Sequence, residues 1–222
     1  MNNFQAVIFD MDGTLIDSMQ LWRNVDREFL HTRGLIVPPD LFSELPQGNS
    51  FIQTAQYFKD RFGLPDSPES IMQEWTKMVS KHYETDIMLK PGVVELLSCL
   101  QEKGIKIGLG TSNSLELAKK VLIRNSVWQY FQCAVTGDIN LKGKPYPDIY
   151  LLAAERLEEK PENCLVIEDT LTGVQAGKSA GMTVFAIYDE DSSDQHSLIK
   201  EIVDGFYWDF KSLAEDLFRT WK

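Results

Sequence analysis

The sequence predicts an α/β fold, a doubly wound parallel sheet with an all-helical segment inserted after the first strand. Three observations lead to this prediction. Short, continuously apolar runs indicate strands buried on both faces, which is typical of parallel sheets. From residue 91 onward these runs alternate with amphipathic helical patterns. Residues 18–88, in contrast, carry helical patterns and no strand pattern.

The first predicted strand covers residues 6–9, and three predicted helices follow it. Apolar spacing places them from residue 18 to about 34, from residue 49 or 50 to 63, and from residue 67 past residue 82. The third helix is expected to bury one face, made of Ile71, Trp75, Met78, Val79 and His82. The remaining elements are helices over residues 93–103, 114–124, 147–157, 173–180 and 209–221, and strands over 105–109, 131–135, 164–167, 183–187 and 205–208.

The spacing of the first two strands predicts the domain organisation. A strand–helix–strand unit takes roughly 30 residues, yet residues 10–104 separate these two strands. We therefore expect an α/β core domain made of residues 1–17 and 89–222. A helical cap domain of residues 18–88 is expected to lie over the end of the first strand, where a lid would sit.

Composition narrows the function. In this 222-residue chain, 43% apolar and 25% charged residues are ordinary for a globular protein, and no apolar run approaches a membrane span. The first strand begins at once, leaving no room for a signal peptide, and the three scattered cysteines suggest no disulfide framework. We expect a cytoplasmic monomer. A net charge of −11 argues against nucleic acid as a partner, but not against a small phosphorylated metabolite.

Two carboxylates one residue apart follow the first strand, in Asp10-Met11-Asp12-Gly13-Thr14. Two such charges about 4 Å apart repel by roughly 4 kcal/mol at an effective dielectric constant of 20, so a folded chain keeps them for a cation or a shared proton. The alternative is that Asp12-Gly13 forms only a turn. A calcium-binding loop does not fit, because its other ligands are misplaced.

Further polar residues follow other predicted strands. Thr111-Ser112-Asn113 opens a helix, where backbone N–H groups bind phosphate, although Ser112 or Asn113 could serve only as the N-cap. Lys144 precedes a proline, and the adjacent acids Glu168 and Asp169 end an apolar strand. Carboxylate oxygens suit Mg²⁺, and phosphoryl transfer needs such charge neutralisation together with an in-line nucleophile. A carboxylate can be that nucleophile, and a second one the general acid and base.

In these motifs the sequence resembles the haloacid dehalogenase superfamily, in the branch of beta-phosphoglucomutase and small sugar phosphatases. The matching residues are Asp10-Met11-Asp12-Gly13-Thr14, Thr111-Ser112, Lys144-Pro145, Pro147-Asp148, Glu168-Asp169, Gly173-Val174 and Ala176-Gly177. The resemblance implies that Asp10 is the nucleophile and Asp12 the general acid and base. It also implies that Asp169 and Glu168 hold Mg²⁺ with Asp10 and the main-chain carbonyl of Asp12. By the same resemblance Thr111, Lys144 and the N–H of Ser112 bind the phosphoryl group.

The cap residues favour hydrolysis over phosphoryl transfer between two positions of one sugar. Mutases of this branch hold a second phosphate partly with a cap arginine and histidine. The aligned residues here are Phe51, in Gly48-Asn49-Ser50-Phe51, and Trp22, and these aromatic rings cannot neutralise a phosphate. We expect Trp22, Gly48, Asn49 and Phe51 to set specificity for a sugar phosphate or nucleotide-like phosphate. The mutase remains an alternative.

A third alternative is a phosphorylatable signalling receiver, which also combines a doubly wound sheet, acids and a lysine. Receivers place adjacent acids after the first strand and the lysine after the fifth. Here the first acids are separated by Met11, Lys144 precedes Glu168, and a large helical insertion is present. These differences make the receiver the least favoured of the three hypotheses about function.

Overall fold

A computed structural model describes residues 4–41 and 50–219, and its centre is a six-stranded sheet in the order β3-β2-β1-β4-β5-β6. Every pair of neighbouring strands is parallel. The strands are β1 (Ala6–Phe9), β2 (Lys106–Gly110), β3 (Cys133–Val135), β4 (Cys164–Glu168), β5 (Thr183–Ile187) and β6 (Gly205–Tyr207). The predicted doubly wound parallel sheet is confirmed.

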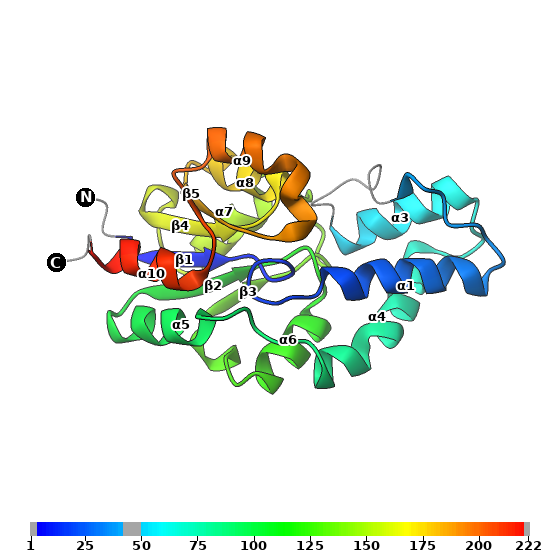
Figure 1. Cartoon of the computed structure of the whole chain (residues 1–222), viewed down its shortest axis with the longest axis horizontal. Coiled ribbons are helices and arrows are strands. Elements are labelled where there is room, and N and C mark those ends of the chain that lie inside the picture. The colour runs from blue at the N-terminus through cyan, green and yellow to red at the C-terminus, as the bar shows by residue number, and fades with distance from the viewer. Residues whose placement is uncertain (1–3, 42–49, 220–222) are drawn as a thin grey trace.

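Helices cover both faces of this sheet (Figure 1). One face carries α5 (Val93–Glu102), α6 (Leu115–Arg124) and α10 (Phe210–Arg219), and the other carries α7 (Asp148–Arg156), α8 (Leu171–Ser179) and α9 (His196–Ile202). Side chains of β1 alternate between the two layers: Val7 and Phe9 pack in the first core, Ala6 and Ile8 in the second. Burial on both faces explains why this strand is continuously apolar.

Of the helices described between β1 and β2, all but α5 lie beyond one end of the sheet, opposite the two termini (Figure 1). They are α1 (Met19–Thr32), α3 (Phe51–Phe62) and α4 (Pro68–Thr85). One aromatic side chain from each helix meets in their centre: the ring centroid of Trp75 lies 5.4 Å from that of Phe29 and 5.0 Å from that of Phe58. These helices therefore pack around an aromatic centre, which is continuous with the apolar layer under α5, α6 and α10.

The chain enters and leaves this helical part through two segments that run side by side. The N–H of Lys90 donates to the carbonyl of Leu15 at 2.8 Å, and the N–H of Asp17 donates to the carbonyl of Met88 at 3.3 Å. Ile16 and Leu89 form an antiparallel bridge between the same segments. The domain limits at residues 17/18 and 88/89 stay a prediction.

Several details differ from the expectations. The third strand begins at Cys133 rather than at residue 131, and α9 was not expected, because seven residues are too few to show a clear helical period. On α4 the buried face ends at Tyr83 and not at His82, which is exposed and hydrogen-bonded to Asp86. Asp209 caps α10, as expected, by accepting from the N–H of Ser212 at 2.7 Å. Residues 220–222, where that helix was expected to end, lie outside the described residues.

Over residues 4–41 and 50–219, the helices are too short or too polar to cross a lipid bilayer. The expected cytoplasmic location, the monomeric state and the absence of a nucleic-acid partner stay predictions.

Candidate active site

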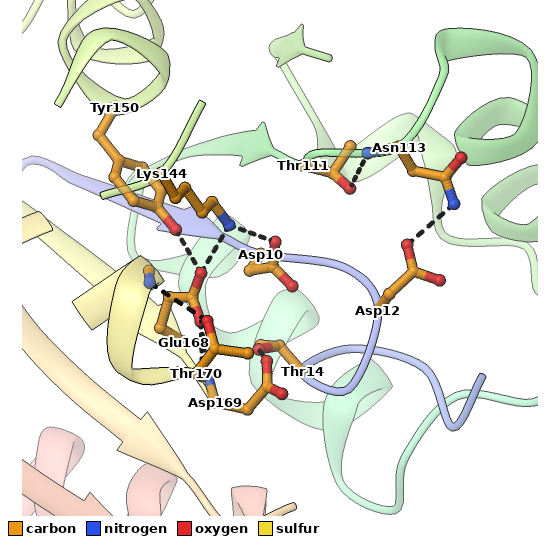
Figure 2. Close-up of polar contacts among 11 residues, drawn as sticks. Asp10, Asp12, Thr14, Thr111, Asn113, Lys144, Tyr150, Glu168, Asp169 and Thr170 are labelled. Carbon is orange, nitrogen blue, oxygen red and sulfur yellow. Dashed lines mark hydrogen bonds and ion pairs between the residues drawn. The ribbon is translucent and has the colours of Figure 1, made fainter. Parts of the chain in front are cut away.

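The predicted polar residues gather at the carboxyl ends of three neighbouring strands (Figure 2). Asp10 follows β1, Thr111 follows β2, and Glu168 is the last residue of β4. Backbone hydrogen bonds to the neighbouring strands fix two of these residues. The N–H of Asp10 donates to the carbonyl of Ile167, and the N–H of Thr111 donates to the carbonyl of Val135, each at 3.0 Å. Strand order reverses between β1 and β4, and ligands of open α/β sheets bind at such a point.

Lys144 lies between two carboxylates at this edge (Figure 2). Its ammonium nitrogen is 2.5 Å from Asp10 Oδ1 and 2.5 Å from Glu168 Oε1. All three side chains are almost fully buried. The hydroxyl of Tyr150 also donates to Glu168 Oε1, at 2.9 Å. Charge-assisted hydrogen bonds of this kind fix an ammonium in place.

The second oxygen of Glu168 is held by the start of α8. Glu168 Oε2 accepts from the N–H of Asp169 at 2.8 Å and from the N–H and hydroxyl of Thr170 at 2.9 and 3.1 Å. The hydroxyl of Thr170 in turn accepts from the N–H of Gly173 and caps the helix. A Cβ on Gly173 would lie 1.7 Å from Glu168 Oε1, so a glycine is needed there. Both oxygens of Glu168 therefore have protein partners.

Asp169 is oriented by the segment that follows β1. The hydroxyl of Thr14 donates to Asp169 Oδ1 at 2.6 Å. Gly13 has a φ of +84°, and a Cβ there would lie 2.3 Å from Asp169 Oδ2. The turn expected at Asp12-Gly13 is present, because the N–H of Leu15 donates to the carbonyl of Met11 at 2.8 Å. This turn brings the backbone close to Asp169 and so belongs to the site.

One carboxylate oxygen from each of Asp10, Glu168 and Asp169 lies within 4.8 Å of the others. Burial raises the pKa of Asp10 to about 8, with Lys144 opposing and Glu168 adding to the rise. Burial, followed by Glu168 and Asp10, holds the pKa of Asp169 well above its usual range. Three buried carboxylates with one ammonium carry two excess negative charges when ionised. These hard oxygen donors fit a divalent cation such as Mg²⁺, which would compensate that charge.

Asp12 lies apart from this cluster (Figure 2), and its hydrogen bonds reach the helical part of the chain. Its Oδ1 accepts from the hydroxyl of Ser18 at 2.6 Å, from the indole N–H of Trp22 at 3.3 Å and from the hydroxyl of Tyr83. Its Oδ2 accepts from the amide of Asn113 at 3.0 Å. Donors from α1, from α4 and from the loop after β2 therefore meet on this one carboxylate.

The loop after β2 differs from the expected cap. Ser114, and neither Ser112 nor Asn113, caps α6, by accepting from the N–H of Leu117 at 3.3 Å. The amide of Asn113 is consequently available to Asp12. The hydroxyl of Thr111 accepts from the N–H of Asn113 at 3.1 Å.

Two of the four expected specificity residues lie beside Asp12. Trp22 and Phe51 meet edge to face at 5.8 Å and line a cavity of about 190 Å³ that Asp12 also lines. The N–H of Phe51 donates to the carbonyl of Ser112 at 3.0 Å and so joins α3 to the loop after β2. Gly48 and Asn49 lie outside the described residues.

Sequence reasoning missed Tyr83, the amide contact of Asn113 and the contact between Tyr150 and Glu168. For Tyr83 a signal was present, since it lies four residues after Val79 on the face that becomes buried. For Tyr150 the helical spacing showed burial at most, not that its hydroxyl reaches Glu168.

Residues 4–181 match the family model described as haloacid dehalogenase-like hydrolase. The chain is 34% identical over 178 residues to the phosphorylated carbohydrates phosphatase of Thermotoga maritima, covering 80% of this chain and 82% of that protein. It is 29% identical to hexitol phosphatase B of Escherichia coli, covering 80% of each.

Among solved structures, CbbY from Rhodobacter sphaeroides in complex with phosphate has a TM-score of 0.84 at 24% identity, covering 95% of this chain and 96% of that one. This likeness shows the fold. A candidate beta-phosphoglucomutase from Thermotoga maritima has a TM-score of 0.73 at 29% identity, covering 97% and 99%.

Proposed function

Because the chain belongs to the haloacid dehalogenase-like hydrolase family and is a phosphatase of its sugar-phosphatase and beta-phosphoglucomutase-like branch, we propose that it hydrolyses a small sugar phosphate or nucleotide-like phosphate through phosphorylated Asp10. The observation that carries the proposal is the position of Lys144. Its ammonium nitrogen lies 2.5 Å from a carboxylate oxygen of both Asp10 and Glu168, beside a third acid, Asp169. Family membership also favours an enzyme over the receiver alternative. We place the chemistry in a core of residues 1–17 and 89–222, and specificity in a cap of residues 18–88.

In the first step a carboxylate oxygen of Asp10 forms a bond to phosphorus, and the bond from phosphorus to the alcohol oxygen of the substrate breaks. Asp12 gives its proton to that oxygen, so that the leaving group departs as a neutral alcohol. The ammonium of Lys144 and the hydroxyl of Thr111 hold oxygens of the transferring group, which carries the charge in the transition state.

In the second step Asp12, now ionised, takes a proton from water. The water oxygen bonds to phosphorus, the bond from phosphorus to Asp10 breaks, and inorganic phosphate leaves. The four donors around Asp12 orient its carboxylate from both the core and the helical part, as its role as a base in this step requires.

The buried carboxylates of Asp10, Asp169 and Glu168 need a counterion, and we therefore assign Mg²⁺ to these three residues and the main-chain carbonyl of Asp12. When bound, Mg²⁺ compensates the charge of the acids and of the phosphoryl oxygens. Glu168 contributes in a second way, since it holds Lys144 at its position beside Asp10.

The cavity beside Asp12 supports hydrolysis over mutase chemistry. Among the described residues that line it there is no lysine, arginine or histidine. A mutase must hold a second phosphate while the sugar bisphosphate reorients, and aromatic rings such as those of Trp22 and Phe51 do not neutralise that charge.

The test is a phosphate-release screen of the purified chain with Mg²⁺ over sugar phosphates and nucleotide phosphates. We expect release from at least one sugar phosphate, its loss in EDTA, and its loss in Asp10→Asn. Assays for isomerisation of hexose 1-phosphates run in parallel. No release from the whole panel would refute the hydrolase, and isomerisation faster than release would replace it by the mutase.

A further inference from the structure

A carboxylate lies on the apolar face of α1. Asp26 follows Trp22 by four residues, so both side chains share one face of the helix. Only 7% of Asp26 is exposed, and Val25, Phe29 and Leu30 around it are buried as well. Aspartate is almost never buried to this degree unless it is paired.

Asp26 has no such pair. Within residues 4–41 and 50–219 its carboxylate accepts no hydrogen bond and forms no ion pair. Burial raises the pKa of Asp26 to about 7, with the charge of neighbouring Arg27 opposing the rise. An aspartate this deeply placed in an apolar face without a protein hydrogen bond departs from the usual rules of folding, and such departures concentrate at functional sites.

The carboxylate borders the cavity that Asp12 also lines. The cavity measures about 190 Å³, and its aromatic walls are Trp22 from α1, Phe51 from α3 and Trp75 from α4. This volume corresponds to about six water molecules and lies below the roughly 300–1,000 Å³ of sites for drug-sized ligands. It therefore suits a small metabolite whose reacting end lies at Asp12.

We propose that Asp26 determines specificity by accepting hydrogen bonds from hydroxyl groups of the alcohol that leaves, so that the enzyme prefers polyol phosphates. This inference rests on the proposed function, in which the leaving alcohol occupies the cavity beside Asp12. The aromatic walls offer apolar surface to the carbon chain, and Asp26 offers the acceptor that its hydroxyls need. An alcohol without hydroxyls leaves the carboxylate buried and unpaired, and sites built in this way reject such analogues.

The experiment compares kcat/KM for two esters of equal chain length, sorbitol 6-phosphate and n-hexyl phosphate, with phosphoethanolamine as a cationic probe. The variants are Asp26→Leu and Asp26→Asn, and Glu28→Gln is the matched control, an exposed acid on the same helix. We expect Asp26→Leu to lower the preference for sorbitol 6-phosphate over n-hexyl phosphate by at least about tenfold, the loss of a hydrogen bond to a charged group. Asp26→Asn should lower it less, and Glu28→Gln should not change it.

Each outcome decides the inference. An unchanged preference in Asp26→Leu, with wild-type hydrolysis of sorbitol 6-phosphate intact, would overturn the role of Asp26 and leave the phosphatase standing. An effect of Asp26→Leu confined to phosphoethanolamine would replace the polyol by an amino alcohol, because aromatic walls with a carboxylate also bind cations. Wild-type protein inactive on every phosphate ester tested would overturn the proposed function and this inference together.

Discussion

Replacing Asp26 by asparagine should stabilise the protein in a manner that depends on pH. The pKa of Asp26 is about 7 in the folded chain against an ordinary value of 3.8. The folded state therefore binds this proton more tightly than the unfolded state, and ionisation destabilises the fold increasingly between these two values. Each pKa unit corresponds to about 1.36 kcal/mol. Asp26→Asn, which cannot ionise, should thus raise the free energy of unfolding by about 4 kcal/mol near pH 8 and by about 2 kcal/mol near pH 5.

Urea unfolding at these two pH values measures the difference. Fluorescence is a suitable signal, because Trp22 and Trp75 both lie beside Asp26 in the cavity wall. Every other titrating group is common to the two proteins, so the change with pH in their difference belongs to Asp26. Glu28→Gln, on the exposed face, should stay within about 0.5 kcal/mol of wild type. A stabilisation by Asp26→Asn that is equal at both pH values, or absent, would refute the reasoning.

Three further predictions concern the catalytic cluster. Lys144→Met leaves two buried carboxylates without their ammonium. We expect its free energy of unfolding, measured with urea, to fall by about 3–5 kcal/mol and its phosphate release to vanish. An active variant would contradict the role assigned to Lys144. Gly13→Ala places a Cβ 2.3 Å from a carboxylate oxygen of Asp169 and should abolish phosphate release. The matched control is Gly34→Ala, at a φ of +69° where an added Cβ meets nothing within 4 Å. Its free energy of unfolding should fall by only about 1–2 kcal/mol, and it should stay active. Equal activity of Gly13→Ala and Gly34→Ala would contradict the importance of the close approach between Gly13 and Asp169. Asp169→Asn should raise the Mg²⁺ concentration for half-maximal activity at least about tenfold, measured by titration, and an unchanged requirement would remove Asp169 from the metal site.

The fold and the position of the core residues were predictable because their signals are local. An apolar strand that ends in polar residues is visible in the chain, and parallel strands bring these ends to one edge of the sheet. Asp10, Thr111 and Asp169 meet there for this reason. Their catalytic roles stay predictions, since geometry alone does not test them.

The helical part was less predictable, because the face that a helix buries depends on its neighbours. On α4 the pairs Met78–His82 and Val79–Tyr83 have the same four-residue spacing, and packing against α1 and α3 selects the second. The same holds for Asp26. An acid beside apolar residues is usually assigned to the edge of a helix face, and only the arrangement of three helices shows that this one is enclosed.

The paired segments that connect the two parts have a consequence for protein engineering and for the divergence of relatives. Asp17 and Met88 are joined by a backbone hydrogen bond of 3.3 Å, so the two ends of residues 18–88 meet at one point of the core. Insertions with neighbouring ends are tolerated well. This segment could therefore be exchanged as a cassette for that of a relative, closing the core with a short linker or a foreign cap. We expect such chimaeras to change which alcohol is released, while the residues at the strand ends to which we assign phosphoryl transfer keep their positions.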